Sequence, residues 1–512
     1  MRTANLDEQS INSREAALKW EAVDWVKVEA FVNKIQTRIA KAQVEGNRKL
    51  VRELQRMLTH SYYAKLLSVK KVTGTTGKRT AGVDNERWDT PGKKYLGAMK
   101  LKQEGYKAKP LKRVYITKSN GKKRPLGIPT MTDRAMQALE ALALDPIIES
   151  MSDKRSFGFR KGRSCQDAME QLFRRLAPGK CAQWVLEGDI KSCFDEISHN
   201  WLLEHTPMDK GILREFLKAG YVYNKELFPT EQGTPQGGII SPILANFTLN
   251  GIDRLMQDNF KQKWVKGERH SISITPKVNP VRYADDFVIT ARTKDIAEEA
   301  KELVRKHIAQ RGLKLSEEKT VITHICDGFD FLGFNFRKYK GKLLVKPSKK
   351  SQQKVKDKIR DVIKNNKNAT QDNLIRMLNP IITGWSNYFR GTAAKETFGK
   401  IHNMTFLLLW KWARRRHPNK GRRWIKNRYW KTVGNNRWVF MDTQTLLRMS
   451  DKKIIRHIPL KLDMNPYIDR EYFRKRYIRL LVNRRFGHLP ESGNGTKTET
   501  GNNRAEDCLH EA

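Results

Sequence analysis

The sequence predicts an α+β fold in which a mixed middle region with an antiparallel sheet lies between two helical regions. Three observations lead to this prediction. Near the N-terminus, apolar residues recur at helical spacing, for example at Ile35, Ile39 and Ala42. From about residue 76 to residue 340, short β-rich runs alternate with helical patterns. After about residue 345, amphipathic helical patterns return, as at Val355 and Ile359.

These changes in pattern divide the chain into four parts. The parts are residues 1–75, 76–340, 345–490 and 491–512. A linker rich in Gly, Thr and Lys, Thr73–Thr80, joins the first two, and a hairpin is predicted around the turn Ser119–Gly121. The last part is polar and rich in Gly, Asn and Thr, which predicts a disordered tail.

The chain is strongly basic, with 100 Lys and Arg against 55 Asp and Glu in 512 residues and a formal net charge of +45. Residues 341–490 alone contain 37 Lys and Arg and nine Asp and Glu. Tryptophans alternate with basic residues between Phe398 and Met441, a pattern that suits base stacking beside phosphate contacts, although core packing explains any single tryptophan equally well. This balance favours a nucleic acid as partner. No membrane is expected, because no apolar stretch approaches the roughly 20 residues of a spanning helix.

Acidic residues lie at the ends of two predicted strands. Asp189 follows the apolar segment Trp184–Leu186, and Tyr283–Asp286 is the predicted tip of a β-hairpin. Carboxylates that two strands bring together suit divalent metal ions, because Mg²⁺ prefers oxygen ligands and two such ions promote nucleotidyl transfer. Neighbours on a strand point to opposite faces, so we expect Asp285 rather than Asp286 to bridge the ions with Asp189. An isolated pair of aspartates is otherwise typical of a solvated turn.

The segment Gln236–Pro242 is predicted to lead from a loop into a helix. Ser241 is a good N-cap, and Pro242 suits the first helical position. Two glycines allow the backbone to approach a substrate closely, so Gln236 is a candidate contact for a base pair or a nucleotide. Taken alone, this pattern is an ordinary start of a helix.

Five segments stand in a fixed order along the chain: Ser156–Ser164, Asp189–Asp195, Tyr283–Asp286, Gly312–Thr320 and Phe331–Phe334. Each is weak evidence alone, but the ordered set, within residues 75–480, resembles the reverse transcriptases encoded by group II introns. The resemblance implies a right-hand polymerase. It assigns a helical N-terminal extension to residues 1–75, fingers and palm to 76–340, a thumb or maturase domain to 345–440 and a DNA-binding segment to 441–490.

The resemblance also implies roles for individual residues. Asp189, Asp285 and Asp286 would hold two Mg²⁺ ions, for which Mn²⁺ can substitute, and Lys319 would donate a proton to the leaving pyrophosphate. The residues implied in nucleotide binding are Lys118, Arg124, Ile190, Phe194 and Gln236, of which Phe194 would exclude a ribose 2′-OH. The residues implied at the primer and template are Tyr283, Phe331, Leu332 and Gly333.

Simpler explanations stay open for some of these residues. Lys118 and Arg124 also fit solvated charges on a hairpin, and Phe194 also fits a core position. Lys319 also fits an ordinary surface lysine. Asp195 is better explained as a structural residue than as a catalytic one.

Two later segments extend the resemblance. Gly384–Phe389 resembles the segment with which the family holds its intron RNA, and Ile455–Leu460 resembles the beginning of the DNA-binding segment. Contacts with RNA or DNA are expected from Arg160, Arg163, Trp385, Arg414, Arg415, Arg422, Arg423 and Arg456. Many relatives end in a zinc-bound H-N-H endonuclease. We expect none here, because Cys508 is the only cysteine after Cys326.

The resemblance therefore implies an RNA-directed DNA polymerase that is also an intron maturase. The expected partners are the group II intron RNA, target DNA, a primer/template duplex and dNTPs, with a homodimer left open. Five cysteines without a C-x-x-C pair, and no signal-peptide pattern, favour the bacterial cytoplasm or nucleoid. Two alternatives are a domesticated reverse transcriptase used in repair or defence, and a splicing cofactor without catalysis. The second would be expected to have lost metal-binding carboxylates, and all three aspartates are present.

Overall fold

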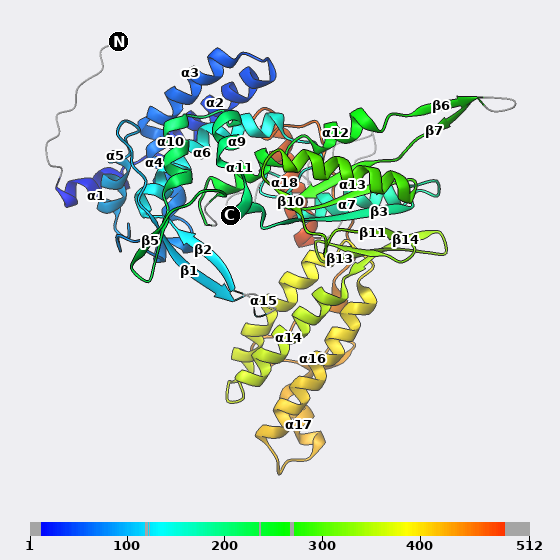
Figure 1. Cartoon of the computed structure of the whole chain (residues 1–512). Coiled ribbons are helices and arrows are strands. Elements are labelled where there is room, and N and C mark those ends of the chain that lie inside the picture. Colours follow the sequence, from blue (N-terminus) through cyan, green and yellow to red (C-terminus); the bar gives the residue numbers. More distant parts are fainter. Residues whose placement is uncertain (1–11, 118–120, 122, 235–236, 267–270, 487–512) are drawn as a thin grey trace, which may run out of the picture.

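The computed structural model describes residues 12–117, 121, 123–234, 237–266 and 271–486, and Figure 1 shows its arrangement. A block of helices comes first: α1 (Ser13–Glu21), α2 (Trp25–Val44), α3 (Arg48–His60), α4 (Tyr62–Thr73), η1 (Thr76–Arg79) and α5 (Pro91–Met99). The first three helices begin at an Asn or Asp side chain that accepts a backbone hydrogen bond from the first turn. At α2, for example, Asp24 accepts from the N–H of Lys27 at 3.0 Å.

The helix α6 (Met131–Met151) lies at the centre of the molecule. Helices α2, α3 and α4 all pack on it. Its buried side chains point in every direction, and they include Ala135, Leu139 and Ile147. The N-terminal helices cover it, so that buried residues, including the charged Glu149, lie on all sides of the helix.

The first sheet has the strand order β2–β1–β4–β5. Its strands are β1 (Leu111–Thr117), β2 (Lys123–Ile128), β4 (Tyr221–Tyr223) and β5 (Glu226–Phe228). β1 and β2 pair antiparallel from Lys112 to Thr117 of β1 and over all of β2, so the predicted hairpin is confirmed. Of its turn, Ser119 and Asn120 lie outside the described residues.

The second sheet is antiparallel and has the order β10–β3–β9–β8, with β11 also paired to β3. Its strands are β3 (Trp184–Lys191), β8 (Asn279–Tyr283), β9 (Asp286–Ala291), β10 (Lys314–Leu315) and β11 (Val321–His324). Alternate residues of β3 face opposite sides. Leu186 packs in one core cluster with Val304 of α13 (Lys294–Ala309), and Val185 packs in another with Leu172 of α7 (Cys165–Leu176). Helices thus cover both faces.

The remaining central elements surround this sheet. They are α8 (Cys193–Glu196), α9 (His199–His205), α10 (Lys210–Lys218), α11 (Ser241–Thr248), α12 (Ile252–Asn259), β6 (Lys263–Lys266) and β7 (Ser271–Ile274). A third sheet, β12–β13–β14, follows with β12 (Phe329–Phe331), β13 (Phe334–Tyr339) and β14 (Lys342–Pro347). This small sheet leads directly into the next helical part.

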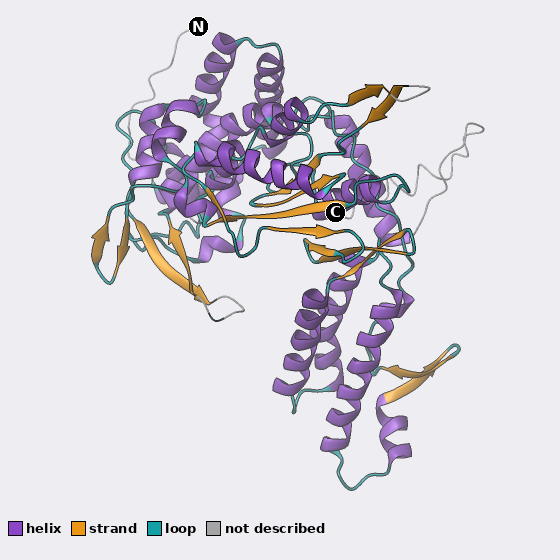
Figure 2. Cartoon of the chain, turned by 45° about the vertical axis from the view of Figure 1, so that its right-hand side comes forward, coloured by secondary structure: helices purple, strands orange, loops and turns teal. Residues whose placement is uncertain are grey.

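The thumb, which we define as residues 349–440, projects away from the sheets as a bundle of long helices (Figure 2). Its elements are α14 (Lys349–Asn365), α15 (Gln371–Phe389), α16 (Lys395–Arg416), α17 (Arg422–Tyr429), β15 (Trp430–Val433) and β16 (Asn436–Phe440). Helix α14 packs on both α15 and α16, and the apolar stripe Val355, Ile359 and Ile363 faces the bundle core.

The chain then returns from the thumb to the central part through η2 (Met449–Asp451) and α18 (Arg470–Phe486), which lies beside the sheets in Figure 1. We call residues 453–483 the C-terminal brace. It contacts the thumb through the N–H of Ile455, the palm helix α7 through His457 and Arg476, and α2 through the carbonyl of Tyr467. One segment therefore joins three parts of the molecule.

The predicted α+β fold with an antiparallel sheet is confirmed by the second sheet, whereas the first sheet includes one parallel pair, β1 with β4. None of the described helices combines the length and apolar character that crossing a membrane requires.

Candidate active site

Asp189 and Asp286 lie directly opposite each other on the neighbouring strands β3 and β9. Residues opposite each other in an antiparallel pair point to the same face of the sheet, so both carboxylates lie on one surface. Strands β8 and β9 pair Tyr283 with Asp286, which leaves Ala284 and Asp285 as a two-residue turn. Ala284 adopts the left-handed conformation that such a turn needs, with φ at 58°. The predicted hairpin tip is therefore present, with Asp285 beside the facing pair.

Lys319 lies against this carboxylate group. Its ammonium donates a hydrogen bond to Oδ2 of Asp189 at 2.7 Å. This bond is the main cause that raises the pKa of Lys319, and the charges of Asp189, Asp286 and Asp285 raise it further. All three aspartates therefore lie near enough to Lys319 to act on its charge.

The neighbouring negative charges also change the pKa of Asp286. Desolvation at the hairpin, followed by repulsion from Asp285 and Asp189, raises the pKa of Asp286 to about 6. Solvent nevertheless reaches its side chain. A cation could therefore enter and relieve the repulsion.

Carboxylate oxygens are the kind of ligand that a divalent cation takes, but the residues do not form a metal site as they stand. Within the described residues, no three His, Cys, Asp or Glu side chains are grouped so that they could hold a metal ion as they stand. Asp189 forms an ion pair with Lys319, whose ammonium supplies the positive charge that a bound cation would otherwise supply. Oxygen donors on one face, with a carboxyl pKa raised by its neighbours, suit a hard divalent cation. The strand register places Asp286 opposite Asp189 and Asp285 in the adjoining turn.

The hairpin is held from beneath by Arg282, a residue that the sequence analysis missed. Its buried guanidinium donates to Oδ1 of Asn246 and to the carbonyl of Ala284, both at 3.0 Å. Burial lowers the pKa of Arg282 to about 10. Asn246 in turn donates to the carbonyl of Gly158 at 2.8 Å, and a Cβ at Gly158 would lie 2.3 Å from the backbone nitrogen of Ala284. The sequence offered one signal for this residue, namely an arginine within a strand of mostly apolar residues.

The predicted primer contacts lie at the junction with the thumb. Leu332 and Gly333 form a turn with φ at 52° and 81°, and Tyr388 of α15 donates to the carbonyl of Leu332 at 2.8 Å. Phe331 is buried. Burial and a side-chain hydrogen bond with Cys165 raise the pKa of Tyr283 to about 12. Helix α15 therefore positions the predicted primer turn.

The predicted nucleotide contacts are placed only in part. Phe194 is half-buried, with its ring edge-on to that of Phe159 at 6.4 Å. The side chain of Ile190 lies in the core on the side opposite Asp189, which leaves only its backbone for a nucleotide. Arg124 is exposed on β2. Lys118 and Gln236 lie outside the described residues.

Two of the arginines expected to contact nucleic acid are instead buried in an ion pair. The Nε and Nη2 groups of Arg160 each donate to Glu149 at 2.7 Å, and Arg163 donates to the same carboxylate at 3.2 Å. Burying a guanidinium is tolerated when a carboxylate and hydrogen bonds compensate it. We therefore correct the expectation, because both arginines stabilise the palm from within.

The other expected contacts differ in exposure. Trp385 packs inside the thumb against Phe389 and Phe398, and its Nε1 donates to Ser351 at 3.3 Å. The five remaining arginines are exposed, namely Arg414, Arg415, Arg422, Arg423 and Arg456. The thumb surface therefore keeps most of the predicted positive charge.

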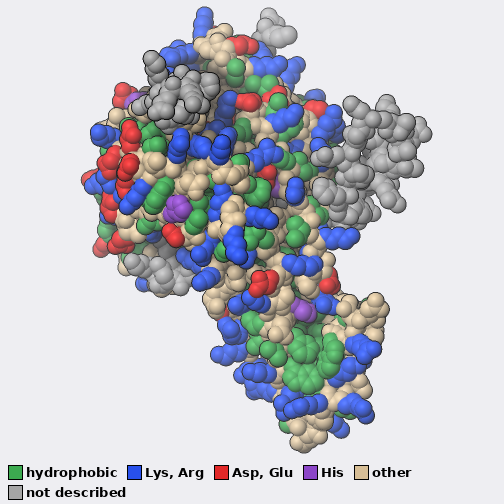
Figure 3. All heavy atoms as spheres, turned by 90° about the vertical axis from the view of Figure 1, so that its right-hand side faces the viewer, with side chains coloured by type: hydrophobic (Ala, Val, Ile, Leu, Met, Phe, Trp, Pro, Cys, Tyr) green, Lys and Arg blue, Asp and Glu red, His purple; other side chains and the backbone are tan. Residues whose placement is uncertain are grey.

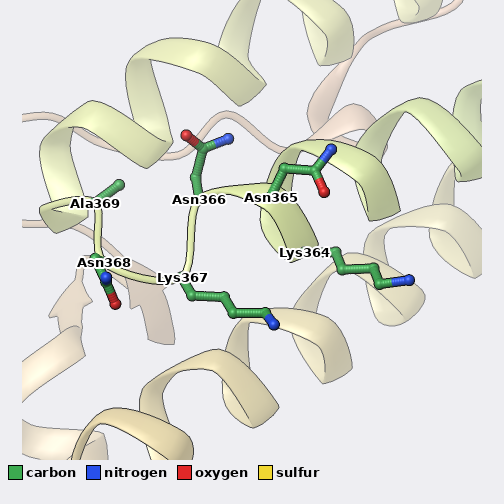
Figure 4. Close-up of a pocket in the computed structure, with 6 residues that line it drawn as sticks. All are labelled: Lys364, Asn365, Asn366, Lys367, Asn368 and Ala369. Carbon is green, nitrogen blue, oxygen red and sulfur yellow. The ribbon is translucent and has the colours of Figure 1, made fainter.

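A hollow of about 500 Å³ lies at the loop between α14 and α15, and Figure 4 shows its lining. The lining residues are Lys364, Asn365, Asn366, Lys367, Asn368 and Ala369. Arg416 donates to the carbonyls of Lys367 and Ala369 at 3.1 and 2.8 Å, which fixes the loop on α16. The hollow carries no carboxylate and belongs to the thumb, so it is no part of the aspartate site.

Comparison with known families gives three matches along the chain. Residues 116–336 match "Reverse transcriptase (RNA-dependent DNA polymerase)", residues 20–101 match "N-terminal domain of reverse transcriptase", and residues 352–430 match "Group II intron, maturase-specific domain". The first match contains the aspartate site, and the third lies within the thumb. The chain also shares 13% identity with a solved telomerase structure from Candida albicans, with a TM-score of 0.34 over 60% of this chain and 61% of that one.

Two curated relatives are similar in sequence. The group II intron-encoded protein LtrA of Lactococcus lactis subsp. cremoris is 34% identical over 46% of this chain, which spans 48% of LtrA, about half its length. The protein YkfC of Escherichia coli is 36% identical over 44% of this chain and 67% of its own length. With the three family matches in their expected order, these similarities show that the chain belongs to the reverse transcriptases encoded by group II introns.

Proposed function

We propose that this chain is an RNA-directed DNA polymerase and an intron maturase, which binds its intron RNA for splicing and copies it into DNA. The observation that carries the proposal is the pair Asp189 and Asp286, facing each other on β3 and β9 with Asp285 alongside. Family membership supports the reaction type. The hydroxyl at the primer 3′ end would attack the α-phosphorus of a dNTP and release pyrophosphate.

The residues of the site would divide this work. Asp189, Asp285 and Asp286 would hold Mg²⁺, which activates the attacking oxygen and neutralises the triphosphate when it is bound. Lys319, which donates to Asp189 in the structure, would give its proton to the leaving pyrophosphate. The ring of Phe194 would press against the sugar and exclude a 2′-OH.

Positioning falls to residues outside the reacting group. Arg282 fixes the carbonyl of Ala284 and with it the hairpin, and Tyr388 fixes the turn at Leu332 that would hold the primer. These contacts would hold the hairpin and the primer turn in place before substrate arrives, which lowers the cost of orienting reactants.

The basic thumb would bind the intron RNA, and the C-terminal segment would bind target DNA. The exposed arginines of the thumb could replace counterions on the phosphate backbone of the RNA. Since dNTPs and chromosomal DNA are both substrates, we place the reaction in the bacterial cytoplasm. A homodimer is compatible with the proposal but nothing in it requires one.

Primer extension on an RNA template with Mg²⁺ tests the proposal. Replacing Asp189 or Asp286 by Asn should lower the rate roughly a thousandfold or more, because several kcal/mol of charge stabilisation is lost. Affinity for the intron RNA should stay unchanged, since the thumb is separate from the site. Asp361→Asn, at an exposed position of α14, is the matched control. Extension at the wild-type rate by either active-site variant would refute the assignment.

The same assay separates the alternatives. A splicing cofactor without catalysis would give no extension in the wild-type protein while still promoting splicing of the flanking intron RNA. A domesticated reverse transcriptase would extend the primer without any effect on splicing.

A further inference from the structure

Three aromatic side chains form a continuous surface on the thumb, which we call the tryptophan face: Phe406, Trp410 and Trp438. Phe406 and Trp410 lie one turn apart on α16, with ring centroids 6.3 Å apart. Trp438 of β16 stands edge-on to both, at 5.7 and 5.9 Å. Trp430 is buried beneath them, 5.2 Å from Trp410. The short hairpin therefore presents its aromatic side chains against a helix.

Core packing explains only the inner part of this cluster. Trp430 and Phe440 are almost fully buried, but Trp438 is 49% exposed. Two aliphatic neighbours, Val433 and Leu407, are about half exposed as well. Figure 3 shows hydrophobic side chains gathered on the thumb and bordered by Lys and Arg. Exposed apolar patches with a polar rim commonly mark interaction sites.

The surroundings of the tryptophan face call for an anionic partner. The eleven Lys and Arg residues from 411 to 437 have no ion pair with a carboxylate among the described residues, and the stretch Phe398–Met441 contains no Asp or Glu. The ammonium of Lys426 lies 6.0 Å from the centroid of the Trp438 ring. A second copy of a chain with a net charge of +45 would be repelled.

We propose that the tryptophan face is a docking site for an unpaired base of an RNA, which stacks on Trp438 while Lys426 contacts an adjoining phosphate. The site rests on the proposed function, since the RNA is the substrate that the maturase match at residues 352–430 supports. Aromatic rings beside basic side chains are the usual combination for single-stranded nucleic acids. A base-paired helix would offer the phosphates but no free base.

Equilibrium binding to two probes tests this site. One probe is a 20-nucleotide single-stranded RNA, and the other is a blunt RNA duplex of the same length. Trp438→Ala should weaken binding to the single strand roughly tenfold to a hundredfold, as expected when one base has no ring to stack on. Binding to the duplex should change less than twofold. Trp438→Phe should keep most of the affinity, and Phe173→Ala, a partly exposed aromatic residue on α7, should have no effect.

Salt dependence distinguishes stacking from charge. Trp438→Ala should leave the slope of log affinity against log salt unchanged, whereas Lys426→Gln should reduce it by about 0.7, the value for one phosphate contact on a single strand. Equal losses on both probes, or wild-type affinity of Trp438→Ala for the single strand, would overturn the proposal. Tighter binding to the matching DNA strand, or to anionic phosphatidylglycerol vesicles with the same Trp438 dependence, would assign the face to another partner.

Primer extension by Trp438→Ala on a short RNA template separates this inference from the proposed function. If the function is right and the docking site is wrong, Trp438→Ala extends and binds like the wild type. If the function is wrong, Asp189→Asn and the wild type behave alike in extension, whatever Trp438→Ala does to RNA binding.

Discussion

The aspartate hairpin and the tryptophan face show opposite relations between charge and partner. At the hairpin, the two cations have partners within the chain: Lys319 pairs with Asp189, and Arg282 donates to Asn246 and to a backbone carbonyl. On the thumb, residues 411–437 carry eleven Lys and Arg without a carboxylate partner among the described residues. The palm therefore holds a geometry by itself, whereas the thumb leaves its charges for another molecule.

This difference has an energetic basis. Buried polar groups are stable only when they are paired, so the hairpin can be kept in one position by a network of hydrogen bonds. Exposed cations need no internal partner, and they repel each other weakly in water. Catalysis needs the first arrangement, and reversible binding of a polyanion needs the second.

The largest expected effect comes from breaking the buried ion pairs that join the C-terminal brace to α7. Asp167 lies fully buried and accepts from His457 at 2.8 Å and from Arg476. Asp167→Ala should lower the free energy of unfolding by roughly 3–5 kcal/mol, because a buried arginine is left without its partner. Urea denaturation measures this loss. Asp463→Ala on the brace is the control, since its ion pair with Lys154 is largely exposed.

The effect of Asp167→Ala should also depend on pH. Burial acts to raise the pKa of Asp167, but the hydrogen bond with His457 and the charge of Arg476 outweigh it and lower the pKa below its usual value. A carboxyl with a depressed pKa in the folded state stabilises the protein above about pH 4 and loses that contribution as the pH falls further. The difference between variant and wild type should therefore shrink below pH 4. A constant difference would contradict the ion pair.

The next effect concerns the hairpin itself. Arg282→Ala should lower kcat roughly a hundredfold, because Asn246 and the carbonyl of Ala284 lose their donor and the hairpin can shift by a fraction of an ångström. The affinity for RNA should not change. Steady-state primer extension gives kcat and KM separately, and Arg254→Ala on the exposed side of α12 is the control. A rise in KM alone would indicate that Arg282 acts in substrate binding.

A smaller effect is expected at the junction of palm and thumb. Tyr388→Phe removes only the hydroxyl that donates to the carbonyl of Leu332, which should cost about 1 kcal/mol, or roughly fivefold in kcat/KM for the primer. Tyr339→Phe, at a partly exposed tyrosine of β13, provides the control. If Tyr388→Phe leaves the kinetics of primer use unchanged, the turn at Leu332 does not depend on the thumb.

Much of the aspartate site could be predicted from the sequence because it depends on local rules. A two-residue turn between apolar strands fixes the hairpin, and the apolar segment that ends at Asp189 predicts a buried strand. The sequence could not predict that Asp286 lies opposite Asp189, since the register of β3 against β9 sets this pairing. Alternation along one strand carries no information about that register.

The sequence could not show which basic residues stay at the surface. Arg160 and Arg163 stand in a basic segment of the sequence, as Arg422 and Arg423 do. The first two are nevertheless buried against Glu149. The C-terminal brace was missed for a similar reason, because Asp167 and Arg476 are 309 positions apart. Pairings over such separations depend on the whole fold and leave no periodic pattern.

The smallest effect is expected on the thumb, where charges act independently. The double change Arg422→Gln with Arg423→Gln should lower the slope of log affinity for RNA against log salt by about 0.7 for each phosphate that these arginines neutralise. Stability should not change, since neither arginine has a partner carboxylate among the described residues. The control pair is Lys294→Gln with Lys306→Gln on the exposed side of α13. An equal change of slope in both pairs would mean that RNA affinity depends on the total charge of the protein rather than on charges of the thumb. The palm and the thumb would then differ only in which side chains are buried.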